Sequence, residues 1–138
     1  MVVGNGHIEA SPDYRYAGLW WLIGWSLVAL VVVLSLMPDP PEPVEFSHAD
    51  KLEHLFAYGL MMIWFAQLVA KHRQFRWALG LVAMGIGLEF VQGWGGYRMF
   101  DGLDMLANSA GVLLGWWLAR RRLGGSLARV DRLLAGRV

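Results

Sequence analysis

Ionisable and amide side chains recur at helical spacing in three stretches of an otherwise apolar sequence. They are Asp50, Lys51, His54 and Tyr58 in the first stretch, Glu89 and Gln92 in the second, and Arg98, Asp101, Asp104 and Asn108 in the third. Residues three or four apart share one face of a helix, so each stretch presents its polar groups on one side. Carboxylates and imidazole perform general acid–base chemistry, and cationic side chains bind phosphate and carboxylate groups. These residues are therefore the candidate site.

The composition of the chain is too apolar for an ordinary soluble domain. Of its 138 residues, 57% are hydrophobic, and the mean hydropathy is +0.42. A net charge of +1 without a basic–aromatic patch predicts no nucleic-acid partner. The absence of cysteine excludes disulfides, thiolate catalysis and cysteine metal sites. The composition predicts a small polytopic membrane protein whose partner is the lipid bilayer.

Apolar runs near the length of about 20 residues that crosses a bilayer define the predicted helices. The predicted spans are residues 17–37, 50–70, 77–92 and 103–118. We expect an all-α fold, an antiparallel bundle of four transmembrane helices in one membrane domain over residues 17–122. A polar N-terminal tail (1–16) precedes it and a basic tail (123–138) follows. The first span is too long for a signal peptide and lacks a cleavage pattern, so we expect it to be retained.

Three further patterns bear on how the helices lie. Tryptophans near the start of the first span, Trp20, Trp21 and Trp25, fit an aromatic belt or lipid-facing bulk. The Gly111 and Gly115 pair matches the small-xxx-small pattern of close helix packing. In the basic tail, Ser126 could cap a short amphipathic helix lying in the membrane surface; a frayed tail is the alternative.

Basic residues in the connections predict the topology. The connection at residues 71–76 and the C-terminal tail hold nearly all of them, which places both termini and this connection in the cytoplasm. The proline-rich loop before the second span and the turn at residues 93–100 then face outside. All three polar stretches consequently meet at the outer face. A charge deep in lipid costs about 2.5–3.5 kcal/mol on the insertion scale, so we expect these side chains to face one another or a water-filled pocket.

The order and spacing of these motifs resemble the VanZ-like family of small bacterial integral membrane proteins. The matching residues are Asp50, Lys51, His54 and Tyr58, then Glu89 and Gln92, then Gly96, Arg98, Asp101, Asp104, Asn108 and Gly111. In the turn, Gly95-Gly96-Tyr97-Arg98 stands where Pro-Gly-Arg is more usual. The resemblance implies a multi-pass protein of the bacterial cytoplasmic (inner) membrane. It also implies an association with resistance to the glycopeptide antibiotic teicoplanin, and hence work on the cell envelope, but no established reaction.

Two functions follow from these residues. In the first, the outer pocket binds or acts on an anionic, lipid-linked envelope molecule. Asp104, Glu89 and His54 are then catalytic, and the substrate-binding residues are Asp50, Lys51, Tyr58, Gln92, Arg98, Asp101 and Asn108. Mg²⁺ or Ca²⁺ would suit such oxygen ligands, but the spacing assigns no metal ligand and no cofactor. In the second, the protein is a non-enzymatic scaffold or excludes antibiotic, and its charges form a structural salt-bridge network. Ion transport is less favoured because the inner halves of the spans are apolar. The sequence does not predict the oligomeric state.

Overall fold

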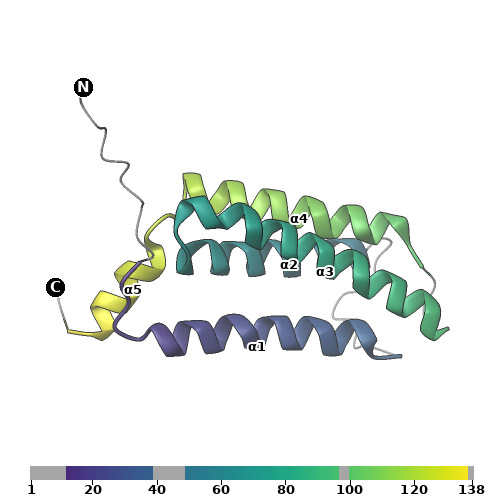
Figure 1. Ribbon diagram of the computed structural model, residues 1–138, viewed down its shortest axis with the longest axis horizontal. Helices are drawn as coiled ribbons and strands as arrows, with labels where there is room; N and C mark the ends of the chain where they lie inside the picture. Colours follow the sequence, from purple (N-terminus) through teal and green to yellow (C-terminus); the bar gives the residue numbers. More distant parts are fainter. Residues whose placement is uncertain (1–11, 39–48, 97–99, 137–138) are drawn as a thin grey trace, which may run out of the picture.

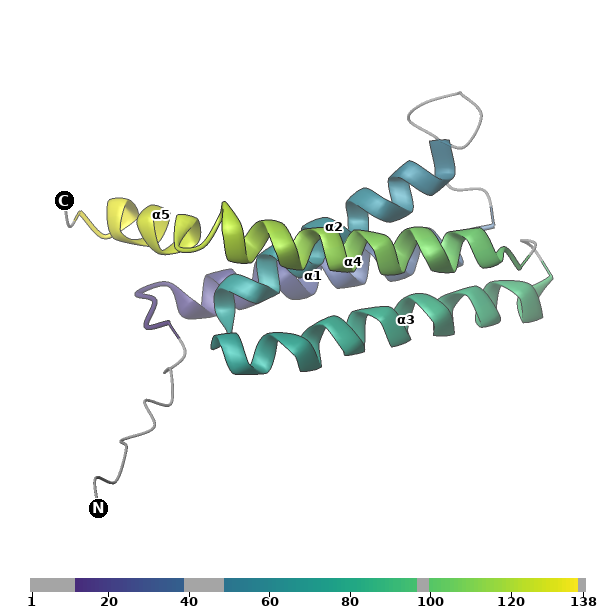
Figure 2. The same ribbon diagram turned by 90° about the horizontal axis from the view of Figure 1, so that it is seen from above.

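The computed structural model describes residues 12–38, 49–96 and 100–136. In this part of the chain the structure is all-helical, as predicted, with no strand. The elements are α1 (Ala17–Leu36), α2 (Ala49–Leu68), the short 3₁₀-helix η1 (Lys71–Arg73), α3 (Gln74–Gly95), α4 (Gly102–Arg121) and α5 (Ser126–Leu134). The long helices α2, α3 and α4 lie together, and α1 runs along their underside in Figure 1. Helix α5 lies at the end of the molecule where α1 begins (Figures 1 and 2).

Two helical segments are long and apolar enough to cross a membrane. They are α1 and the continuous stretch Lys71–Gly95, which joins η1 to α3. Their large side chains face outward in many places; Leu22 on α1 is 63% exposed and Phe90 on α3 is 59% exposed. Outward apolar faces of this kind suit contact with lipid. The apolar helices thus agree with a membrane protein, and crossing by all four long helices remains a prediction.

The closest helix contact joins α2 to α4 through glycines. A Cβ atom at Gly111 would collide with the carbonyl oxygen of Leu55, and one at Gly115 would collide with that of Gly59. Only glycine permits the two backbones to approach this closely. Large side chains of the core fill the space beside this crossing, with Tyr58, Phe65 and Val112 at most 1% exposed. The prediction that Gly111 and Gly115 mark a close helix contact is therefore confirmed.

Helix α5 is docked on the bundle rather than frayed. Its buried residue Asp131 accepts hydrogen bonds from the backbone N–H groups of Arg15 (2.8 Å) and Tyr16 (3.0 Å). The same carboxylate accepts from Trp20 Nε1 at 2.7 Å. Asp131 thus serves the N-terminus of α1 as a cap supplied from more than a hundred residues away.

A second contact fixes the start of α5. Gln67 Oε1 accepts from Ser126 Oγ at 2.7 Å and from the Leu127 N–H at 2.9 Å. Ser126 therefore does not cap α5, because Gly125, with a φ of 80°, occupies the N-cap position. Of the predicted apolar face of α5, Leu127 is buried, while Val130, Leu133 and Leu134 are exposed.

The tryptophans of α1 do not behave alike. Trp20 is only 6% exposed and lies in the hydrogen-bonded contact with α5, whereas Trp25 is 53% exposed. Trp20 therefore does not face lipid, and only Trp25 keeps the exposure that a membrane-facing side chain needs.

Candidate functional site

Three helices carry polar residues to one end of the molecule. Helix α2 begins there, α3 ends there, and α4 begins there, because consecutive helices run in opposite directions (Figure 1). We call the group that meets at this end the polar cluster. It consists of Asp50, Lys51, His54, Glu89, Asp101, Asp104 and Asn108.

Lys51 is the centre of the ion pairs in the polar cluster. Its Nζ lies 2.9 Å from Asp50 Oδ2, 2.7 Å from Asp101 Oδ2 and 2.8 Å from Asp104 Oδ1. The three carboxylates differ in burial: the side chains of Asp50 and Asp101 are 45% and 38% exposed, that of Asp104 only 8%. Lys51 thus joins α2 to α4 through a buried pair with Asp104 and a more exposed pair with Asp101, while its pair with Asp50 lies within α2.

Asp101 also ends the turn before α4. Its Oδ1 accepts from the Leu103 N–H at 2.8 Å, so Asp101 is the N-cap of α4. The ion pair with Lys51, and then this backbone hydrogen bond, hold the pKa of Asp101 below its usual range. Asp50, by contrast, lies within the first turn of α2, which begins at Ala49.

His54 is held between an amide and a carboxylate of α4. Its Nδ1 lies 3.0 Å from Asn108 Oδ1, and its Nε2 lies 3.6 Å from Asp104 Oδ2. An amide oxygen only accepts, so in this arrangement Nδ1 carries a hydrogen and Nε2 faces the carboxylate. The imidazole of α2 is thus held between two side chains of α4.

Glu89 brings α3 into the polar cluster. It is 2% exposed, and its Oε2 accepts from the Asp101 N–H at 3.3 Å. One turn earlier, Gly85 leaves room for the polar cluster: a Cβ there would lie 3.0 Å from Asn108 Nδ2 and 3.1 Å from Tyr58 Cε1. Gly85 was not predicted as a site residue. Its position four residues before Glu89, on the same helix face, was the available signal.

The remaining predicted residues have different places. Tyr58 is 1% exposed and lies one helical turn beyond His54 in the core. Gln92 Nε2 donates to the carbonyl oxygen of Ser35 at 2.6 Å, which ties the end of α3 to the end of α1. Gln92 thus acts in helix packing. Arg98 lies outside the described residues.

Two groups within the polar cluster have the composition of a cation site. His54, Glu89 and Asp104 each offer a ligand atom within 4.8 Å of the others, and so do Asp50, Asp101 and Asp104. Carboxylate oxygens are the preferred ligands of Mg²⁺ and Ca²⁺. Among the described side chains, however, every buried nitrogen and oxygen atom has a hydrogen-bond partner, so nothing in the geometry requires an ion.

A comparison with known protein families identifies the family of this chain. The family model described as VanZ/LLP1 matches residues 14–124, which is most of the chain and includes every helix of the polar cluster. The chain belongs to the VanZ/LLP1 family. A search of curated proteins and a search of solved structures each gave no match. The VanZ/LLP1 match starts just before α1 and ends just after α4, so α5 lies beyond it.

Proposed function

We propose that this VanZ/LLP1 family protein binds or transforms an anionic, lipid-linked molecule of the cell envelope at the outer face of the bacterial inner membrane. In this proposal the four long helices cross the membrane and both termini are cytoplasmic. The polar cluster then lies at the outer end of the bundle. Family membership and the apolar helices support the membrane setting.

The observation that carries the proposal is the burial of two acids beside a histidine. Glu89 and Asp104 are 2% and 6% exposed, and Asp104 lies 3.6 Å from His54 Nε2. Buried ion pairs contribute little net stability compared with apolar packing of the same volume, so stability alone is a weak reason for them. A carboxylate and an imidazole at this distance can pass a proton to or from a bound hydroxyl or phosphate.

Lys51 is the described residue placed to receive the anionic group. Its partners Asp50 and Asp101 are more exposed than Asp104. In this proposal a phosphate or carboxylate replaces these two partners, while the buried pair with Asp104 keeps the ammonium in position. In this proposal Asp50 and Asp101 hold Lys51 in place until the substrate arrives.

The test replaces the buried acids without changing their shape. Glu89→Gln and Asp104→Asn should each lower activity at least about tenfold while the protein accumulates in the membrane at the wild-type level. Activity is read as teicoplanin resistance in a sensitive host, together with the amounts of lipid-linked envelope intermediates. Glu53→Gln is the matched control, because Glu53 is an exposed acid on α2. Wild-type activity in both variants would contradict the proposal.

A structural role has its own supporting observation. Lys51 contacts three carboxylates, and no described buried polar side-chain atom lacks a partner, so the polar cluster is satisfied without a ligand. A non-enzymatic scaffold or an antibiotic-excluding protein would need no more. In that case Glu89→Gln and Asp104→Asn lower folded protein and activity by the same factor.

An apolar replacement of the buried pair separates the two functions. Replacing a buried ion pair by apolar side chains is often neutral for stability. The double variant Lys51→Met with Asp104→Leu should therefore fold and insert. If the polar cluster is a chemical site, this folded protein is inactive; if it is a structural network, activity returns with folding.

A further inference from the structure

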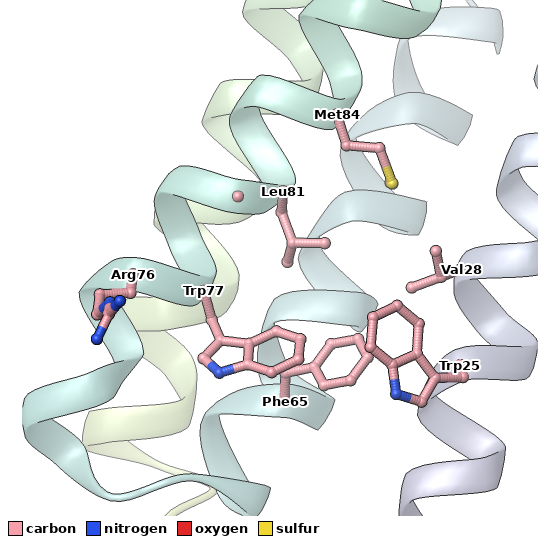
Figure 3. Close-up of a pocket in the computed structure, with 8 residues that line it drawn as sticks. Trp25, Val28, Phe65, Arg76, Trp77, Leu81 and Met84 are labelled. Atoms are coloured by element: carbon pink, nitrogen blue, oxygen red, sulfur yellow. The ribbon is translucent and has the colours of Figure 1, made fainter.

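An apolar groove of about 440 Å³ lies at the opposite end of the bundle from the polar cluster. Helices α1 and α3 form its walls, and Phe65 of α2 forms its floor. Figure 3 shows Trp25 and Val28 on one side facing Trp77, Leu81 and Met84 on the other. This volume is within the range of about 300–1,000 Å³ typical of ligand sites.

Three aromatic rings make the groove a preformed surface. Phe65 stacks on Trp77 with ring centroids 4.4 Å apart, and Trp25 lies 5.8 Å from Phe65 and 6.0 Å from Trp77. Helix α1 touches α2 next to the groove at Gly24, where a Cβ would lie 3.0 Å from the Phe65 ring. The rings are held by their contacts with one another, so the groove does not need an occupant to give it shape.

The helices that form the groove indicate whether it faces lipid or water. They belong to α1 and to the stretch Lys71–Gly95, the two segments that can cross a membrane by length and composition. When both segments cross the membrane, the groove between them opens onto lipid chains rather than water. From Arg76 to Met84 it follows α3 over eight steps between residues, about 12 Å at 1.5 Å per residue. That is close to the depth of one leaflet, about half of a 30 Å hydrocarbon core.

The end of the groove carries positive charge. Arg76, in the first turn of α3, is the charged residue of its lining. Within the described residues no hydrogen bond or ion pair occupies its guanidinium. Lys71, His72 and Arg73 precede it in η1 and are exposed. Basic groups next to a membrane helix attract anionic headgroups.

We propose that this groove binds one acyl chain of an anionic phospholipid, with the headgroup phosphate paired to Arg76. The apolar walls select a hydrocarbon chain, the leaflet-deep length matches a chain that enters from its own headgroup level, and the cation selects an anionic lipid over a zwitterionic one. This site is independent of the polar cluster and lies in the other half of the membrane.

The test uses a glycine in the groove and a matched glycine outside it. Gly80 lines the groove, and a Cβ there would meet nothing within 4 Å, so Gly80→Leu fills the space without a backbone clash. Gly87, on the same helix, has equally open surroundings but is not among the lining residues, so Gly87→Leu controls for helix propensity and added bulk. Arg76→Gln removes the charge, and Arg73→Gln is its control.

The full chain is reconstituted in vesicles of equal phosphatidylcholine and phosphatidylglycerol, extracted in mild detergent and examined by native mass spectrometry. We expect one retained phosphatidylglycerol per wild-type chain, at least fivefold less on Gly80→Leu, and wild-type retention on Gly87→Leu. Arg76→Gln should retain both lipids equally, and Arg73→Gln should keep the preference. Equal retention by Gly80→Leu and wild type would overturn the proposal, as would a wild type that retains no lipid. A dimer that Gly80→Leu converts to monomer would also overturn it, because a second chain would then be the occupant.

Discussion

At the scale of single residues, the protein stabilises buried acids in two different ways. Asp104 is paired with a cation, Lys51, at 2.8 Å. Asp131 is instead held by N–H donors from the backbone and from Trp20. Burial raises the pKa of Asp131, but the hydrogen bonds from Trp20, Arg15 and Tyr16 outweigh it, so the pKa lies below its usual range. Asp131 therefore favours the docked position of α5 as long as its carboxylate is ionised.

This lowered pKa predicts a pH dependence for the docking of α5. A carboxyl whose pKa is lower in the folded state contributes stability above its ordinary pKa of about 3.9, and that contribution is lost as the pH falls through the folded value. We expect Asp131→Asn to lower the Tm at neutral pH, since an amide cannot accept all three N–H groups. The Tm difference from wild type should shrink as the pH falls below about 4.

Differential scanning fluorimetry across this pH range measures the effect. Asp13→Asn is the control, because Asp13 is an exposed acid near the same contact. A Tm difference that stays constant down to the lowest pH would mean that the charge of Asp131 does not matter.

At the scale of helices, the sequence predicted which segments are helical but not where α3 begins and ends. It predicted residues 77–92, and the helix covers Gln74–Gly95. Gln74 is polar but buried, because its Nε2 donates to the Ala66 carbonyl and its Oε1 accepts from Trp116. The glycines after Gln92 suggest a turn by propensity, yet the helix continues until Gly96 takes a φ of 73°. Tertiary partners of Gln74 account for the start of α3, and the left-handed conformation of Gly96 accounts for its end.

Sequence reasoning also succeeded only in part for the polar side chains, because it predicted the polar cluster but not the contacts made by α5. Helical spacing was enough to bring the polar cluster together, because its residues repeat at intervals of three and four within each helix. Helical spacing could not pair Gln67 with Ser126 or Asp131 with Arg15, which lie 59 and 116 residues apart in the sequence. Nor could it assign Gln92 to Ser35 rather than to the polar cluster, since that depends on where α1 ends.

The glycine contact between α2 and α4 gives a prediction for helix packing. Gly115→Ala would place a Cβ against the Gly59 carbonyl oxygen, and overpacking of this kind costs about 1–3 kcal/mol. Gly102→Ala is the control on the same helix, because a Cβ there would meet nothing within 4 Å. In thermal unfolding in detergent, we expect a lower Tm for Gly115→Ala and an unchanged or higher Tm for Gly102→Ala. If Gly115→Ala were as stable as this control, the close crossing of α2 and α4 would be wrong.

At the scale of the whole molecule, the two ends of the bundle have different chemistry. One end gathers the acids of the polar cluster, and the other carries the basic connection and the docked α5 (Figure 1). The proposed orientation puts the acidic end outside and the basic end inside, in agreement with the positive-inside rule. The proposed function at the outer face depends on which helix ends face which side.

The absence of cysteine makes this orientation directly testable. Single cysteines can be introduced at Arg73, in the exposed basic connection, and at Trp94, which is 92% exposed near the end of α3. We expect a membrane-impermeant maleimide to label Trp94→Cys in intact cells and Arg73→Cys only after permeabilisation. Labelling of Arg73→Cys in intact cells would reverse the orientation and remove the polar cluster from the outer face.

The glycine crossing of α2 and α4 also has a consequence for biosynthesis. These two helices are not consecutive, since α3 lies between them in the chain. During synthesis, Lys51 and His54 on α2 are therefore made before their partners Asp104 and Asn108 on α4. The ion pair between α2 and α4 and the closest backbone contact can form only after α4 has been synthesised. A chain interrupted after α3 therefore leaves Lys51 with Asp50 alone of its three carboxylate partners, and leaves His54 without Asn108 and Asp104.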